Sequence, residues 1–314
     1  MPLSKLKPRP KRSASVPEVT RWRFEAIGTI WTIEILEPLP VGKAKALLAT
    51  IRRRIAGFDR SYSRFRDDSF VTRMAAAAGT YRLPADAKPL LDLYQSLYAV
   101  TQGAVTPLIG SVLVEAGYDA AYSLQPGELH HPPRWEEVLD YQYPYLNVVQ
   151  PVLLDVGAAG KGYLVDIVSG LLQERGVTAF CVDAGGDMRV QATSGRGLEV
   201  GLEHPDRLGE GIGVARLTDQ AICGSAGNRR AWQGFNHIIN PQSLTSPGEI
   251  KAVWVVAPTA LLADGLSTAL FFTPAHELAR QYSFEYALVR ADDSLEYSRA
   301  FPATFFTEEA GTER

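Results

Sequence analysis

The stretch Leu153–Leu172, "LLDVGAAGKGYLVDIVSGLL", decides how this sequence is interpreted. A short apolar segment leads into the glycine-rich run "GAAGKG" at 157–162, after which apolar residues recur at helical spacing. That order predicts a strand, a turn and a helix from about Lys161 to Arg175. Lys161 falls in the first turn of a helix whose apolar face consists of Tyr163, Leu164, Ile167, Val168, Leu171 and Leu172.

The glycine run fits neither common nucleotide-binding motif. A P-loop requires G-x-x-x-x-G-K-[ST], whose hydroxyl holds magnesium. Here Gly162 follows Lys161, the glycine spacing is too short, and the dinucleotide pattern G-x-G-x-x-G is absent as well. A cation in the first turn opposes the helix dipole, and an anionic ligand would resolve that conflict. Two interpretations stay open: a phosphate-binding turn, and an exposed lysine paired with Asp155 or Asp166.

The composition is that of an ordinary globular protein. The 314 residues are 46% hydrophobic and 21% charged, with a formal charge of −3 and two cysteines. No basic stripe interleaved with aromatic residues is present, so we expect no nucleic-acid binding. Two cysteines, Cys181 and Cys223, are too few for a disulfide scaffold and have no metal-ligand spacing. Reduced thiols fit best, and a single disulfide stays open.

Residues 1–22 predict a disordered arm, because they are basic and rich in proline. They lack the apolar run of a signal peptide, and no segment has the roughly 18 consecutive apolar residues of a membrane span. We therefore expect a cytoplasmic protein without a membrane span. A periplasmic location stays open if the sequence lacks its natural start.

The order of predicted elements favours an α+β fold with a largely antiparallel sheet flanked by helices. Strand patterns occur at 24–36, 147–156, 178–184, 187–193, 198–204, 212–218 and 251–258, with a terminal hairpin at 286–300. Helical patterns occur at 43–60, 84–105 and 260–272, and residues 117–145 predict a long irregular excursion. We expect a single domain over 23–314, and a division into two lobes, 23–146 and 147–314, stays open.

The helical pattern "ALLADGLSTALFF" contains two unusual residues. Asp264 lies in otherwise apolar surroundings, and Gly265 costs about 1 kcal/mol relative to alanine inside a helix. A buried carboxylate needs a partner or a metal. Asp264 and Thr268 are four residues apart and project from one face, so they supply hard oxygen donors suited to Mg²⁺. The alternative is a partly exposed aspartate on an amphipathic helix.

Two shorter motifs allow a structural and a functional interpretation. In "GFNHIINP", His237 precedes an apolar pair and a turn at Asn240, and histidine is the side chain best suited to accept a hydroxyl proton near neutral pH. A single histidine is nevertheless more often structural. In "VDAGGDM", Gly185-Gly186 permits close approach of a ligand to the backbone, and a tight hairpin explains it equally well.

Taken together, these motifs resemble those of the FAD:protein FMN transferases, the ApbE-like flavin transferases, in the same order over about 27–272. The similar segments are "IGTIWTIE", "SYSRFRDDSFVTRM", "GAVTPLIG", "LLDVGAAGKGYLVD", "VDAGGDM", "AICGSAG", "HIINP" and "LLADGLSTALF". The glycine motif "LLDVGAAGKGYLVD" and the last helix are specific in combination.

The resemblance implies a site for FAD as substrate and for Mg²⁺. Mg²⁺ would be held by Asp264, Thr268 and the carbonyl of Ala158, and His237 would be the catalytic base. The implied FAD-binding residues are Ile27, Phe65, Ala104, Val105, Thr106, Asp155, Lys161, Ser225 and Ile238. The sequence departs from the family pattern at Ile27 (usually Met), Thr106 (commonly Asp), Gly224 (Thr) and Asn240 (Asp).

The activity implied is Mg²⁺-dependent transfer of FMN from FAD to a threonine or serine hydroxyl of an acceptor protein, with release of AMP. The expected acceptor is a redox subunit. Because the residues after His237 are altered, two alternatives stay open. One is an FAD-binding carrier or scaffold without transferase activity, and the other is a Mg²⁺-dependent pyrophosphatase that cleaves FAD to FMN and AMP.

Overall fold

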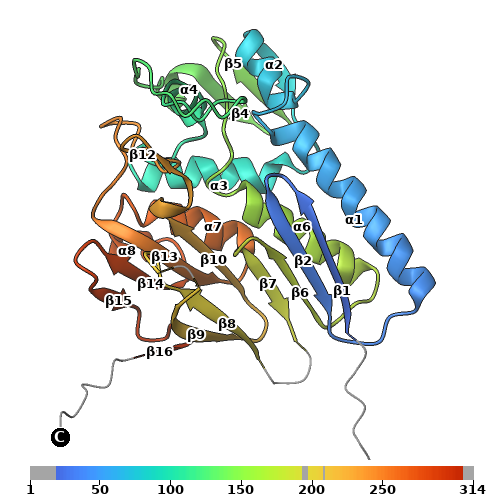
Figure 1. Ribbon diagram of the computed structural model, residues 1–314. Coiled ribbons are helices and arrows are strands. Elements are labelled where there is room, and N and C mark those ends of the chain that lie inside the picture. The colour runs from blue at the N-terminus through green and yellow to red at the C-terminus, as the bar shows by residue number, and fades with distance from the viewer. Residues whose placement is uncertain (1–18, 193–196, 208, 307–314) are drawn as a thin grey trace, which may run out of the picture.

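The computed structural model describes residues 19–192, 197–207 and 209–306 (Figure 1). Its main sheet has eight strands in the order β1-β2-β6-β7-β10-β13-β14-β15, and all neighbouring strands are antiparallel. The expected α+β fold with a largely antiparallel sheet is confirmed. The strands are β1 Thr20–Ala26, β2 Thr29–Ile35, β6 Phe180–Ala184, β7 Met188–Gln191, β10 Ala221–Ala226, β13 Ile250–Ala257, β14 Glu285–Arg290 and β15 Leu295–Tyr297.

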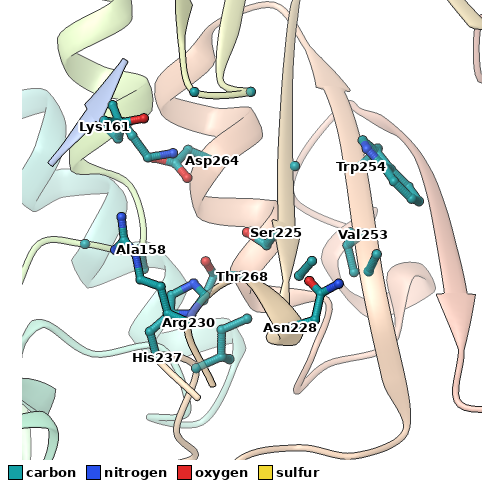
Figure 2. A pocket seen from close by; sticks show the side chains of 18 of the residues that line it. Ala158, Lys161, Ser225, Asn228, Arg230, His237, Val253, Trp254, Asp264 and Thr268 are labelled. Carbon is teal, nitrogen blue, oxygen red and sulfur yellow. The ribbon is translucent and has the colours of Figure 1, made fainter. Parts of the chain in front are cut away.

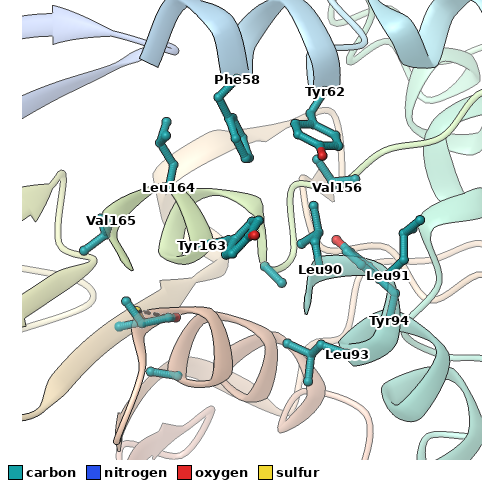
Figure 3. Packing of buried hydrophobic residues seen from close by; sticks show 14 of the residues in the cluster. Phe58, Tyr62, Leu90, Leu91, Leu93, Tyr94, Val156, Tyr163, Leu164 and Val165 are labelled. Atoms are coloured by element: carbon teal, nitrogen blue, oxygen red, sulfur yellow. Dashed lines mark hydrogen bonds between the residues drawn. The ribbon is translucent and has the colours of Figure 1, made fainter. Parts of the chain in front are cut away.

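Helices cover one face of this sheet and enclose the main core (Figures 1 and 3). Phe58 and Tyr62 pack together, with ring centroids 4.6 Å apart, and Tyr163 lies against Phe58 at 6.2 Å. The helical patterns expected at 43–60, 84–105, 161–175 and 260–272 all correspond to helices. The helices are α1 Val41–Tyr62, α2 Phe70–Ala76, α3 Ala87–Val100, α4 Gly110–Glu115, α5 Trp135–Val138, α6 Gly160–Glu174, α7 Ala260–Ala269 and α8 Ala275–Leu278, with short 3-10 helices at Pro107–Ile109 and Gly227–Arg230.

Helix α7 packs closely against both α6 and α3, and glycines make this possible. A Cβ atom on Gly162 would lie 2.1 Å from the carbonyl oxygen of Ala260, and one on Gly265 would lie 2.9 Å from Leu97 of α3. Both oxygens of Asp166 on α6 accept hydrogen bonds from the first backbone N–H groups of α7, at 2.9 and 2.8 Å. The close approach at Gly162 and these hydrogen bonds therefore join α6 and α7 tightly.

The predicted single strand at 24–36 is wrong, because it is a hairpin of β1 and β2. Ile27 and Gly28 form its turn with φ values of 44° and 70°, in the left-handed region. An isoleucine is rare in this conformation, so its apolar side chain concealed the turn in the sequence. On β2, Trp31, Ile33 and Ile35 are fully buried, in the alternation expected of a strand.

Three smaller sheets complete the described fold. A three-stranded sheet orders β3-β5-β4, and part of the expected irregular excursion at 117–145 is therefore regular: residues 135–142 form α5 and β4, and β5 begins at Tyr145. The strand expected at 147–156 is limited to the end of β5. The other sheets order β16-β9-β8 and β11-β12. The remaining strands are β3 Gly79–Arg82, β4 Leu139–Gln142, β5 Tyr145–Val148, β8 Leu198–Glu203, β9 Gly211–Leu217, β11 Ala231–Trp232, β12 Phe235–Asn236 and β16 Ala303–Phe305.

The expected boundaries can be located in this fold. Residues 1–18 of the predicted arm lie outside the described residues, and β1 already begins at Thr20. Strand β2 pairs with β6, so the start of the chain shares a sheet with the second of the two proposed lobes. Within the described residues, every helix is too short or too polar to cross a membrane.

Candidate active site

A cavity of about 610 Å³ brings together nearly all of the site residues expected from the sequence. It lies where α6 and α7 meet the end of β10 and the segment that follows β12 (Figure 2). Ile27 does not line it, because the turn between β1 and β2 carries Ile27 to a separate hollow, and Thr29 lines the cavity instead. The expected residues that do line it are Phe65, Ala104, Val105, Thr106, Asp155, Ala158, Lys161, Ser225, His237, Ile238, Asp264 and Thr268.

Lys161 has a partner that we did not expect. Its ammonium forms an ion pair with the fully buried Asp187, rather than with Asp155 or Asp166. The second carboxylate oxygen of Asp187, Oδ1, is buried without a hydrogen-bond partner among the described residues. Asp187 ends the "AGGD" motif, and this position in a quoted motif was the only sequence signal for it. The pair fixes a cation at the wall of the cavity, where it can meet an anionic group.

The two glycines before Asp187 form a tight hairpin between β6 and β7. Gly185 and Gly186 have φ values of 69° and 103°, and the N–H of Gly186 donates to Asp183 at 2.9 Å. A Cβ atom on Gly185 would lie 2.0 Å from the hydroxyl of Thr29. Both glycines also line the cavity. The turn therefore needs glycine for its own geometry, and it leaves a bare backbone facing the site.

Asp264 is held in place by the junction of α6 and α7. It is 4% exposed, and its Oδ2 accepts the backbone N–H of Gly162 at 2.8 Å. Burial raises the pKa of Asp264, and the charge of Lys161 and the N–H donors oppose that rise. Thr268 lies one turn further along α7 and also lines the cavity. The alternative of a partly exposed aspartate is therefore excluded.

The oxygen donors here suit Mg²⁺. The described residues contain no group of three or more His, Cys, Asp or Glu side chains that could hold a metal ion. The site instead offers one carboxylate from Asp264, one hydroxyl from Thr268 and backbone oxygens of the loop at Ala158, all lining one cavity. Mg²⁺ is commonly bound by one or two carboxylates together with substrate phosphates, so this donor set fits the ion.

Asp155 shapes the loop before α6 instead of projecting freely. Its Oδ1 accepts the N–H of Gly157 at 2.6 Å, and its Oδ2 accepts the Nε–H of Arg64 at 2.5 Å. Arg64 is 6% exposed, and its guanidinium lies 4.1 Å from the ring of Phe65 and 4.9 Å from that of Tyr118. Our sequence interpretation missed Arg64, although it lies in the quoted "SYSRFRDD". It links an aromatic wall of the cavity to the loop that carries Ala158.

His237 is uncharged at neutral pH. Burial, together with the positive charges of Arg230 and Lys161, lowers its pKa to about 4. Its Nδ1 is buried and has no hydrogen-bond partner among the described residues. Arg230 itself donates to the hydroxyl of Tyr118 at 2.8 Å. A neutral imidazole can accept a proton, and it would do so more readily with an anion nearby to offset the charges of Arg230 and Lys161.

Two of the departures from the family pattern keep the local geometry. The side-chain oxygen of Asn240 accepts the N–H of Gln242 at 2.8 Å, a turn that an aspartate would also form. The hydroxyl of Thr106 accepts the N–H of Leu108 at 3.1 Å and caps a 3-10 helix, as an aspartate would. Both replacements therefore preserve the backbone next to the cavity.

A family model and several known proteins match this chain. Residues 27–287 match the model of the ApbE family. The chain belongs to this family. Among its relatives, a FAD:protein FMN transferase of Klebsiella pneumoniae is 25% identical over 271 residues, which cover 78% of this chain and 76% of the relative. One of Treponema pallidum is 25% identical over 294 residues, covering 82% and 79%.

Solved structures of ApbE proteins share the fold. The flavin transferase ApbE from Vibrio cholerae has a TM-score of 0.75 at 20% identity, covering 90% of this chain and 96% of that one. The ApbE protein from Thermotoga maritima has a TM-score of 0.77 at 20% identity, covering 90% and 97%. The family expected from the motifs is thus confirmed, and so is the fold.

Proposed function

We propose that this ApbE-family protein is a flavin transferase that moves FMN from FAD to a threonine or serine hydroxyl of an acceptor protein, a redox subunit, and releases AMP. Family membership and the names of the curated relatives support the general activity. The observation that carries the proposal is that neutral His237 lines the same cavity as Asp264, Thr268 and Lys161. A proton acceptor and an anion-binding wall therefore face one substrate.

In this proposal Asp264, Thr268 and the carbonyl of Ala158 would hold Mg²⁺, which would neutralise charge that develops on the pyrophosphate. Lys161 supplies a second positive charge to the same group, and Asp187 fixes its position. Phe65, Ile238 and the 104–106 backbone form the wall proposed for the flavin ring. Ile27, which the family resemblance implied beside the flavin, lies in a separate hollow, and Thr29 lines the cavity.

The reaction exchanges the phosphoanhydride bond of the pyrophosphate for a phosphoester bond to the acceptor. The acceptor hydroxyl oxygen bonds to the FMN-side phosphorus, the bond from that phosphorus to the bridging oxygen breaks, and AMP leaves with the bridging oxygen. The hydroxyl proton passes to the imidazole of His237. A bound pyrophosphate offsets the charges of Arg230 and Lys161, which are among the causes of the low pKa of His237. Substrate binding therefore makes His237 a stronger base.

The products distinguish the proposal from its alternatives. The purified protein is incubated with FAD, Mg²⁺ and candidate acceptor domains, and both AMP and covalently bound flavin are measured. We expect equal amounts of the two. AMP without covalent flavin would indicate an FAD pyrophosphatase, and bound FAD with neither product would indicate a carrier.

A further inference from the structure

The cavity is lined from both faces of the main sheet. On one face, the hydroxyl of Ser225 on β10 lies 2.7 Å from that of Ser267 on α7. Side chains alternate along a strand, so Gly224 faces the other way, opposite its cross-strand partner Trp254 on β13. Both Gly224 and Trp254 nevertheless line the same cavity as Asp264 and Thr268. A ligand that fills the cavity must therefore be long enough to pass the edge of β10.

That edge is open because β7 ends early. Strand β10 pairs with β7 only at Ala221 and Ile222, although it continues to Ala226. The residues after Ile222 thus border the cavity beyond the hairpin of β6 and β7. The opening leads from the α7 face to the face covered by β8, where Val200 and Gly201 line the cavity beside Trp254.

The indole of Trp254 occupies space that a side chain at position 224 would take. A Cβ atom on Gly224 would lie 3.2 Å from Cδ1 and 3.4 Å from Nε1 of Trp254. Trp254 is half-buried, with part of its ring packed against the core cluster between the main sheet and β8. The indole would have to shift by a few tenths of an ångström for the Cβ atom alone, and a β-branched residue would add two further atoms beside it. The glycine, which replaces the usual threonine of the family motif, therefore leaves room for a broad aromatic surface.

Two polar side chains that line the cavity, Asn228 and His204, bond to protein atoms. Asn228 donates to the carbonyl oxygen of Pro205, and the ring of His204 accepts the N–H of Asp206 at 3.1 Å. This end of the cavity thus combines an aromatic ring with apolar and glycine neighbours. It suits a flat heteroaromatic ring that binds through stacking. Figure 2 shows Trp254 well separated from Lys161, Asp264 and His237.

We propose that Trp254 is the stacking platform for the adenine base of the substrate and that Gly224 provides the room it needs. The inference rests on the proposed function, in which the pyrophosphate lies at Asp264 and the flavin at Phe65. A dinucleotide has a ring system at each end, and the lining of the cavity includes two aromatic rings, Phe65 and Trp254, besides the polar Asp264 and Lys161. The adenine then lies on the β8 face of the sheet, and the AMP half is held apart from the acceptor.

The test compares the affinities of three ligands by calorimetry, with Mg²⁺ present: FAD, AMP and FMN. Trp254→Leu removes the aromatic surface and keeps apolar bulk. We expect it to weaken the binding of FAD and AMP by roughly 5- to 150-fold, the usual effect of losing one base-stacking side chain. FMN has no adenine, so its affinity should stay at the wild-type value, which also shows that the variant is folded.

Two further variants sharpen the result. Trp254→Phe keeps a ring and should retain most of the affinity for AMP, whereas Gly224→Thr should weaken AMP binding because it displaces the indole. Unchanged affinity of Trp254→Leu for FAD and AMP would overturn the platform while leaving the proposed function intact. A parallel loss of FMN affinity would indicate that Trp254 contacts the flavin, and it would overturn the adenine platform as well. If the wild-type protein itself does not bind FAD, the proposed function fails first.

Discussion

The two sides of the cavity are built in different ways. The side with Asp264 and Lys161 belongs to helices whose contacts are fixed at the backbone: Gly162 leaves no space between α6 and α7, and its N–H bonds to Asp264. The side with His237 follows the two-residue strands β11 and β12, and Nδ1 of His237 has no partner among the described residues. In the proposed function, the first side would hold FAD and the second would face the acceptor protein.

On the helical side, the largest expected effect comes from Asp264. Asp264→Ala removes the carboxylate proposed for Mg²⁺ and leaves the N–H of Gly162 without its acceptor. We expect transfer to fall by roughly 100- to 1,000-fold, the scale seen when one group that stabilises transition-state charge is lost. Transfer rates measured across a Mg²⁺ titration should then be flat. Asp140→Ala, at an exposed position on β4, serves as the control and should titrate like the wild type. A normal Mg²⁺ response of Asp264→Ala would refute the metal assignment.

The next largest effect concerns the buried ion pair of Arg64 and Asp155, which links the aromatic wall at Phe65 to the loop before α6. Arg64→Met leaves the carboxylate of Asp155 without its buried cation. Breaking a buried pair from one side costs about 3–5 kcal/mol, and we expect this loss in the free energy of unfolding by urea. Arg66→Met, two residues away, removes an exposed arginine that pairs with Asp59 and Asp68, and it should change stability little. Equal losses in the two variants would contradict a special role for Arg64.

Close packing of α6 against α7 can be tested with a single methyl group. In Gly162→Ala the added carbon would meet the backbone oxygen of Ala260 at 2.1 Å. We expect a loss of about 3 kcal/mol, the upper end of the usual cost of overpacking, together with weaker FAD binding. Gly170→Ala on the same helix meets nothing within 4 Å and should stabilise the protein slightly. If Gly162→Ala behaves like Gly170→Ala in urea denaturation, the helices are not held as closely as described.

The smallest effect concerns the charge of His237. Its pKa is lowered to about 4 in the folded protein, so below pH 6.5 the unfolded chain binds a proton that the folded chain does not. Stability is therefore fully present above that pH and is lost as the pH falls. Between pH 7 and pH 5 the wild type should lose about 2 kcal/mol more than His237→Gln. The comparison with the variant removes the opposite contribution of Asp166, whose pKa burial raises to about 6. An identical pH dependence for the two proteins would show that His237 has an ordinary pKa.

Local patterns in the sequence predicted most of what depends on neighbouring residues. The helix after "GAAGKG" and the shared face of Asp264 and Thr268 follow from helical spacing, and the structure confirms the helices. The hairpin at Ile27 escaped prediction because a left-handed isoleucine has no sequence signal. Its consequence was that the residue expected at the flavin lies in a different hollow.

Contacts between distant segments could not be predicted. Arg64 and Asp155 are 91 residues apart in the sequence, and Lys161 and Asp187 are 26 residues apart. Each pair is brought together by the fold, so local spacing does not reveal it. The same is true of Gly162. In the sequence, Gly162 only ruled out a P-loop, because it stands where that motif needs a hydroxyl; the structure explains it through the helix it packs against. The roles of such residues can be inferred only from the structure, which shows the residues they contact.

The most direct test of the difference between the two sides is flavin transfer by His237→Ala, measured together with its affinity for FAD in the presence of Mg²⁺. If His237 acts on the acceptor hydroxyl, FAD affinity should equal that of the wild type, and covalent flavin on the acceptor should form roughly 100- to 10,000-fold more slowly. Transfer at the wild-type rate, or loss of FAD affinity in step with transfer, would contradict this account.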